Sequence, residues 1–86
     1  MFSIKYENKV TKFLRKLVSK SDVKRIFDKV EELSNNPFPR DIKRVEGYCD
    51  TKVFRVRVGS YRILYLVDYD NSKIYVINID KRGRVY

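Results

Sequence analysis

The sequence predicts a small α+β domain of residues 1–86, with a helical hairpin packed on one face of a mainly antiparallel sheet, in the order β-α-α-β-β-β. Three observations predict this fold. Two stretches in the first half carry apolar residues at helical spacing. The second half alternates apolar and polar residues around a Gly-Ser break. With 86 residues, 43% of them hydrophobic, the chain suffices for one modest core.

The first elements are a short strand and a helix. Residues 2–6 alternate weakly and predict a strand, and Asn8 is the expected N-cap of the helix that follows. The apolar positions of this helix share one face and are Val10, Phe13, Leu14, Leu17 and Val18. The sequence therefore predicts an amphipathic helix whose other side is rich in lysine.

A second amphipathic helix is expected directly after the first. Ser21 is its expected cap, and its apolar face contains Val23, Ile26, Phe27, Val30 and Leu33. The Asn35-Asn36-Pro37 stretch ends it, because a residue before proline avoids the helical region. The two helices form a hairpin whose apolar stripe needs a sheet to cover it.

The second half of the chain supplies that sheet. Residues 41–47 predict a loop or a short edge segment, and residues 52–58 and 61–69 predict a hairpin. Residues 70–72 predict a turn, and residues 73–80 form the most apolar strand. We expect that last strand to be central in the sheet.

The hairpin carries the most informative side chains of the sequence. If Gly59 and Ser60 form its two-residue turn, Arg57 lies directly opposite Arg62, and Arg55 lies on the same face. Like charges in opposed positions destabilise a sheet. Such a cluster favours an anion-binding role, above all for phosphate, whose oxygens match the guanidinium fork. The alternative is a plain solvated sheet face.

Composition limits the partners and the chemistry. The net charge is +9, with about +5 in residues 1–20 and +4 in residues 48–86, so nucleic acid is the first expected partner and an anionic membrane the second. The chain has no histidine and one cysteine, Cys49, which excludes an internal disulfide and a cysteine-cluster metal site. No apolar run is long enough for a membrane span, and the N-terminal residues lack a signal-peptide pattern, so a cytoplasmic location is expected.

The C-terminal residues Lys81-Arg82-Gly83-Arg84-Val85-Tyr86 add three cations and an aromatic ring at the end of the sheet. One interpretation is a frayed basic terminus. The other is a binding segment, in which the cations neutralise phosphate oxygens and the tyrosine stacks on a base.

At this point the chain resembles a known family. The F-R-V-R-V-G-S-Y-R-I-L-Y hairpin, the preceding K-R-V-E-G-Y, and the closing Lys81-Arg82…Val85-Tyr86 are similar to the RelE/ParE toxin superfamily over essentially the whole chain. The resemblance implies the toxin of a type II toxin–antitoxin pair, held inactive by an acidic, RelB-like antitoxin. In the RelE branch it implies ribosome-dependent cleavage of mRNA in the A site, without metal or cofactor. A 2′-hydroxyl attacks the adjacent phosphate and leaves a cyclic phosphate.

The resemblance also implies roles for individual residues. Arg62 matches an arginine that stabilises the scissile phosphate, Arg82 a general acid or phosphate ligand, and Tyr86 a residue that orients the RNA. Arg55 and Arg57 stand where well-studied members have lysines. Because arginine stays protonated, these two can stabilise negative charge but cannot act as bases. The remaining base candidates are Glu46, Asp80, Tyr86 and Lys81.

Further cations are candidates for contact with RNA or the ribosome. They are Lys9, Lys12, Lys16, Lys20, Lys81 and Arg84. For the four helix lysines the alternative is a solvated helix face. Two other functions stay open for the whole chain: a non-catalytic ParE-like poison of DNA gyrase, and a degenerate member that only binds RNA or its antitoxin.

Overall fold

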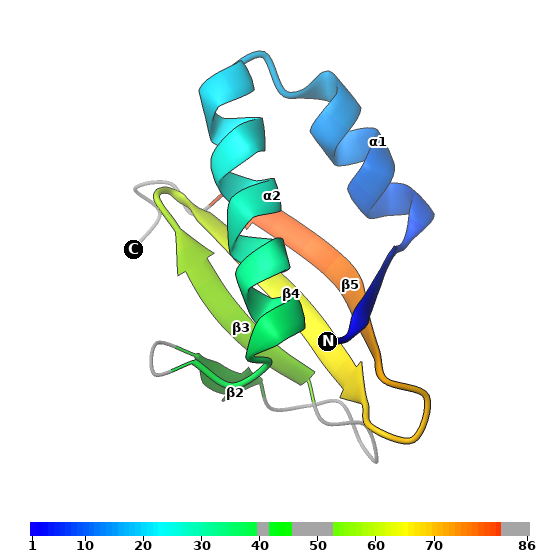
Figure 1. The fold of residues 1–86 in the computed structure, drawn as a ribbon. Helices are drawn as coiled ribbons and strands as arrows, with labels where there is room; N and C mark the ends of the chain where they lie inside the picture. The colour runs from blue at the N-terminus through cyan, green and yellow to red at the C-terminus, as the bar shows by residue number, and fades with distance from the viewer. Residues whose placement is uncertain (40–41, 46–52, 82–86) are drawn as a thin grey trace.

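The computed structural model describes residues 1–39, 42–45 and 53–81, and it confirms the predicted α+β class (Figure 1). The elements are β1 (Ser3–Tyr6), α1 (Asn8–Lys16), α2 (Lys20–Asn35), β2 (Lys43–Val45), β3 (Val53–Val58), β4 (Tyr61–Asp68) and β5 (Lys73–Lys81). Both helices lie on the same face of the sheet. Neither helix of the described ranges has the length and apolar character needed to cross a membrane.

The sheet has five strands in the order β1-β5-β4-β3-β2. The β1–β5 pair is parallel and the other three pairs are antiparallel. For residues 41–47 the sequence predicted either a loop or a short edge segment. The structure has the strand β2 there, so the sheet contains one strand more than the predicted order. The expectation that the last strand is central was wrong. Strand β4 holds the centre, because β5 pairs with β4 on one side and with β1 on the other.

The N-cap residues of both helices precede the predicted ones, by one residue in α1 and by two residues in α2. Glu7 is the cap of α1, and its carbonyl accepts hydrogen bonds from the backbone N–H groups of Val10 and Thr11. Ser19, not Ser21, caps α2, since its hydroxyl accepts from the backbone N–H of Asp22 at 3.3 Å. Because α1 already ends at Lys16, Val18 lies in the connector, 94% exposed, and not on the apolar helix face.

The core lies between the helices and one face of the sheet. It contains Val10, Leu14, Ile26, Val30, Leu33, Val56, Tyr61, Ile63, Tyr65, Ile74, Val76 and Ile79. An irregularity in the β4–β5 ladder pairs Leu64 with Asn78 but Tyr65 with Val76. The extra residue, Ile77, resets the alternation of β5, so that Ile74, Val76 and Ile79 all reach the core.

The turn residues give a stability prediction. Gly59 has a φ of +57°, and an added Cβ there would lie 3.4 Å from the Arg25 guanidinium. Gly59→Ala should therefore lower the free energy of unfolding by about 1–2 kcal/mol. Ser72 also has a positive φ, of 52°, so Ser72→Gly should raise the free energy of unfolding. Urea denaturation of both variants measures this, and equal effects of the two would contradict it.

Candidate nucleic-acid interface

The hairpin register brings three arginines to the sheet face opposite α1 and α2. Arg57 pairs with Arg62 and Val58 with Tyr61, which confirms the predicted two-residue turn. Arg55 is two residues from Arg57 and lies on the same face, opposite Leu64. On the edge strand, Lys43 pairs with Arg55. Four cations therefore lie on adjoining positions of three strands.

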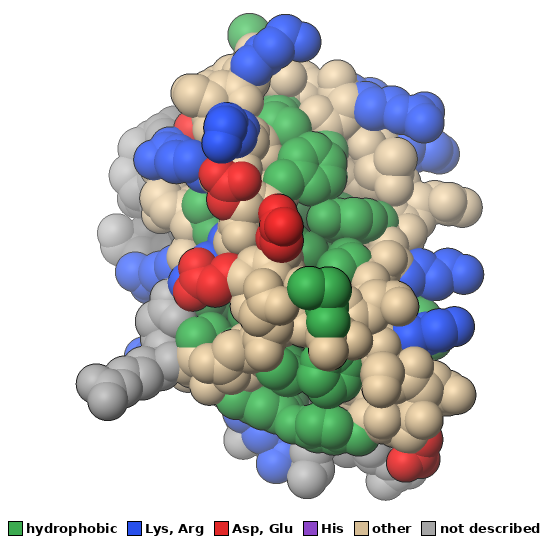
Figure 2. Space-filling model, in the orientation of Figure 1, with side chains coloured by type: hydrophobic (Ala, Val, Ile, Leu, Met, Phe, Trp, Pro, Cys, Tyr) green, Lys and Arg blue, Asp and Glu red, His purple; other side chains and the backbone are tan. Residues whose placement is uncertain are grey.

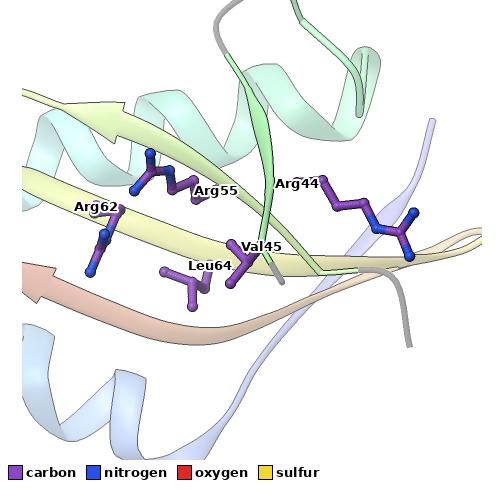
Figure 3. A pocket seen from close by; sticks show the side chains of 5 residues that line it. All are labelled: Arg44, Val45, Arg55, Arg62 and Leu64. Atoms are coloured by element: carbon purple, nitrogen blue, oxygen red, sulfur yellow. The ribbon is translucent and has the colours of Figure 1, made fainter. Parts of the chain in front are cut away.

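A hollow of about 230 Å³ opens beside these arginines. It is lined by Arg44, Val45, Arg55, Arg62 and Leu64 (Figure 3). Arg55 and Arg62 extend from neighbouring strands beside the two apolar side chains, whereas Arg44 points away from them. The hollow thus has an apolar floor and two guanidinium groups, a combination that suits a phosphate with an attached sugar or base.

Arg62 is the most constrained cation of this face. Its side chain is 20% exposed, and its Nη2 donates to the Asp80 carboxylate at 3.3 Å. Its Nε is buried and finds no hydrogen-bond partner among the described residues. An unpaired buried donor costs free energy, so the Arg62 position is retained at some expense to stability.

We call the sheet surface that carries Arg55, Arg57 and Arg62 the arginine face. Asp22 connects the hairpin that bears it to the helices. Its carboxylate accepts from Tyr61 Oη at 3.0 Å and from Arg25 Nη2 at 2.6 Å. The hydrogen bonds from Arg25 and then Tyr61 lower the pKa of the Asp22 carboxyl. Burial, followed by the bond to Asp22, raises the pKa of the Tyr61 phenol. Because Tyr61 follows the turn directly, this contact holds the hairpin tip against the start of α2.

The described residues contain no group of three or more His, Cys, Asp or Glu side chains that would hold a metal ion. What the arginine face offers is positive charge in fixed positions, with one carboxylate beside it. Such an arrangement can bind a phosphodiester and stabilise negative charge that develops on it.

The structure separates the other predicted site residues. Lys81 pairs with Tyr61, so it lies on the helix side of the sheet, where it lines a second hollow with Lys16. The remaining predicted lysines, Lys9, Lys12 and Lys20, are exposed on the helices. Arg82, Arg84, Tyr86, Glu46 and Cys49 lie outside the described residues.

Two contacts of this region were not predicted from the sequence. The Tyr61–Asp22 bond joins residues 39 positions apart, and no local pattern predicts it. The Ser19-Lys20-Ser21-Asp22 stretch does, however, have the spacing of a capping motif, which would have placed Asp22 in the first turn of α2. Asp80, a base candidate from the sequence, is in the fold also the counter-ion of Arg62.

Comparison with known proteins gives one consistent result. The family model of the ParE toxin of the type II toxin–antitoxin system parDE matches residues 4–86. RelE1 from Methanocaldococcus jannaschii is 34% identical over 99% of this chain and 94% of its own length.

Solved structures agree with this match. A chain of the RelE–RelB complex from Pyrococcus horikoshii superposes with a TM-score of 0.83 at 30% identity, covering 98% of both chains. The E. coli RelBE toxin–antitoxin complex gives 0.76 at 23% identity, covering 98% of this chain and all of that one, and shows the shared fold.

The Asp22 contacts predict a pH dependence of stability. Because the folded-state pKa of Asp22 is lowered, its contribution is present above the unfolded value of about 3.9 and is lost as pH falls through the folded value. Asp22→Asn should therefore be less stable than the wild type at pH 7, and the difference should shrink below about pH 4. Denaturation curves between pH 2 and 7 measure it. Asp28→Asn, on the same helix but 59% exposed, is the control; a constant difference for Asp22→Asn would contradict the assignment.

The arginine face predicts stabilisation by phosphate. Inorganic phosphate at many times its Kd should raise the free energy of unfolding by about 1–3 kcal/mol over sodium chloride of equal ionic strength. The double variant Arg55→Gln, Arg62→Gln should lose most of this gain, while Arg15→Gln on α1 keeps it. Thermal unfolding measures the shift. Equal gains in all three proteins would mean that phosphate acts only through general exclusion from the surface.

Proposed function

This chain belongs to the RelE/ParE family of toxins of type II toxin–antitoxin systems, and from that premise we propose that it is a ribosome-dependent endoribonuclease that cleaves mRNA in the A site. The observation that carries the proposal is the cluster of Arg55, Arg57 and Arg62 on the sheet face opposite α1 and α2. A basic face of this kind provides affinity for RNA. Guanidinium groups in fixed positions also stabilise the negative charge that develops in the transition state.

The proposed reaction is a transesterification within the RNA. The 2′-oxygen forms a bond to the adjacent phosphorus, the bond from phosphorus to the 5′-oxygen of the next nucleotide breaks, and the products are a cyclic phosphate and a 5′-hydroxyl. Negative charge grows on the phosphoryl oxygens as the new bond forms. Arg62 lines the hollow and would donate to those oxygens from the exposed part of its guanidinium group. Arg55 and Arg57 would add charge from the neighbouring strand.

The 2′-hydroxyl must lose a proton, and the leaving oxygen must gain one. The arginines cannot accept a proton, because they stay protonated at any physiological pH. Asp80 is the carboxylate beside Arg62, with its Oδ2 3.3 Å from Nη2, and is therefore the described candidate for the base. Arg82 and Tyr86 remain the proposed general acid and RNA-orienting residue. With few acid–base groups at hand, most of the rate enhancement would come from positioning and electrostatics.

The proposed partners are the ribosome, its mRNA and a cognate acidic antitoxin. Two neighbours are RelE–RelB and RelBE complexes, which supports the antitoxin. The exposed lysines of the helices and Lys81 would contact ribosomal RNA. Because the matching family model is that of the ParE toxin, the gyrase poison is the second candidate. It predicts DNA breaks and stalled replication upon induction, in place of truncated messages.

A cleavage assay tests the proposal. On programmed ribosomes, the antitoxin-free protein should cut within the A-site codon, and Arg62→Ala should slow cleavage by about 10²–10³, because one preorganised donor is lost. Primer extension maps the cuts, and single-turnover kinetics give the rates.

Arg15→Ala is the matched control, since it removes an arginine from α1, on the other side of the sheet, and should cut at the wild-type rate. Undiminished cleavage by an Arg62→Ala, Arg82→Ala double variant would refute the catalytic assignment. Intact message with the wild-type protein would shift the proposal to the gyrase poison or to a member that only binds.

A further inference from the structure

Tyr61 is a point at which both helices and three strands meet. It pairs with Val58 of β3 on one side and with Lys81 of β5 on the other. Its side chain is almost fully buried, and its ring contacts Phe13 of α1 edge to face at a centroid distance of 6.1 Å. Because successive residues of a strand point to opposite faces, Arg62 follows Tyr61 directly but lies on the arginine face. The placement of Tyr61 therefore determines where the Arg62 backbone lies.

The start of α2 holds the polar end of Tyr61. One carboxylate oxygen of Asp22 accepts from Tyr61 Oη at 3.0 Å, and the other accepts from Arg25 Nη2 at 2.6 Å. The Arg25 guanidinium also lies over the hairpin turn, 3.4 Å from the position that a Cβ at Gly59 would take. The hydroxyl of Ser19 accepts from the backbone N–H of Asp22 at 3.3 Å, which fixes the start of the helix. Figure 1 shows the start of α2 and the hairpin tip at the same end of the molecule.

Asp22 differs from Asp28 and Glu32 of the same helix, because it reaches the sheet. Figure 2 shows acidic side chains gathered over α2 on the helix-bearing face, with lysines and arginines nearby. Asp28 and Glu32 bind lysines of their own helix, at 3.2 and 3.3 Å. The Asp22–Tyr61 bond instead joins residues that are 39 positions apart. Asp22 is therefore the carboxylate through which α2 acts on the hairpin.

Packing alone does not retain the Tyr61 phenol. A hollow of about 350 Å³ opens beside it, between the end of α1, the connector of residues 17–19 and the end of β5. Phe13 and Asp22 also line this hollow. A side chain that borders open volume lacks packing contacts there and is free to turn into it. Among the described residues, Asp22 is the hydrogen-bond partner of the phenol, and that bond keeps the ring from turning into the hollow.

The arginine pair makes this restraint important. Arg57 and Arg62 are directly opposed, in the second residue pair from the turn. Like charges in opposed positions repel each other, and the end of a ladder opens at a lower free-energy cost than its centre. Asp80 neutralises Arg62 only, with its Oδ2 3.3 Å from Nη2. Without the Asp22–Tyr61 bond, the hairpin tip would open more often and Arg62 would leave its place more often.

We propose that Asp22 and Tyr61 are positioning residues for the reaction, because their hydrogen bond fixes the hairpin tip from the helix side and so holds Arg57 and Arg62 in place on the opposite face. The proposal rests on the proposed nuclease function and adds the helix layer to its scaffold. Both residues lie on the helix side, so neither touches RNA bound to the arginines. A displaced guanidinium group stabilises the transition state less, while the charge that attracts RNA stays the same. Loss of the bond should therefore slow the reaction of the bound complex more than it weakens binding.

Tyr61→Phe tests this role, because it removes one hydroxyl group and keeps the ring. On programmed ribosomes it should lower the maximal single-turnover cleavage rate by about 5- to 20-fold and change the half-saturating toxin concentration by less than about twofold. Tyr65→Phe is the matched control, since it removes a hydroxyl from the same strand whose bond to the Pro37 carbonyl, at 2.7 Å, lies away from the turn. It should cut at the wild-type rate. Circular dichroism verifies that both variants are folded.

A double-variant cycle tests whether the two residues act through one bond. Asp22→Ala should slow cleavage about as much as Tyr61→Phe does, and the double variant should be no slower than Asp22→Ala alone. Asp28→Ala removes a carboxylate that is 59% exposed on the same helix and should cut at the wild-type rate. Multiplied effects in the double variant would mean that the two residues act separately, and would overturn the role assigned to their bond.

Hydrogen exchange of the protein alone gives a second measurement that needs no ribosomes. Followed by mass spectrometry, the backbone amides of residues 57–62 should exchange about tenfold faster in Tyr61→Phe than in the wild type, and at the wild-type rate in Tyr65→Phe. Wild-type exchange and cleavage in Tyr61→Phe would overturn the proposal. Equal slowing of cleavage by both tyrosine variants would also overturn it, because it would indicate a general loss of stability. If the wild type cuts no message, the proposed function alone is refuted, and the exchange result decides whether the bond holds the hairpin tip.

Discussion

The two-residue turn at Gly59 and Ser60 is the constraint on which the arginine face depends. A strand has a side-chain period of two, so a slip of one residue in the β3–β4 pairing would send every side chain of the slipped strand to the other face. The observed register puts Val56 and Ile63 into the core and Arg57 and Arg62 outside it. A positive φ at Gly59 suits the twist of a tight hairpin, and this one backbone position therefore selects which face is apolar and which is cationic.

The same register creates an electrostatic cost that the fold only partly offsets. Arg57 and Arg62 are directly opposed, and Asp80 neutralises Arg62 alone. The core between the helices and the sheet supplies the stability that permits this arrangement. A helix-to-hairpin contact at Asp22 and Tyr61 holds the turn in place against the repulsion. Guanidinium groups that the fold holds near one another are already arranged for an anion, so part of the ordering cost of binding is met during folding.

The sequence was informative wherever a local period or a turn residue decides the outcome. Alternation around Gly59 predicted the pairing of Arg57 with Arg62, and helical spacing predicted both helices and their position on one face. Contacts between distant segments were beyond that reasoning. The Asp22–Tyr61 bond and the irregularity at Ile77 depend on how the helices settle on the sheet and how two strands twist together. The central place expected for β5 was wrong for the same reason: its apolar content marks it as an interior strand but does not distinguish the middle of the sheet from the position next to it.

The two faces of the sheet present different chemistry. On one face, positive charge in fixed positions favours a phosphodiester; on the other, an apolar groove with cations at its rim lies between α1 and α2. The groove lies near the start of α2, where the Asp22 carboxylate accepts a hydrogen bond from Tyr61 and so holds the hairpin tip. The Asp22 contact is thus the direct physical connection between the helix face and the arginines.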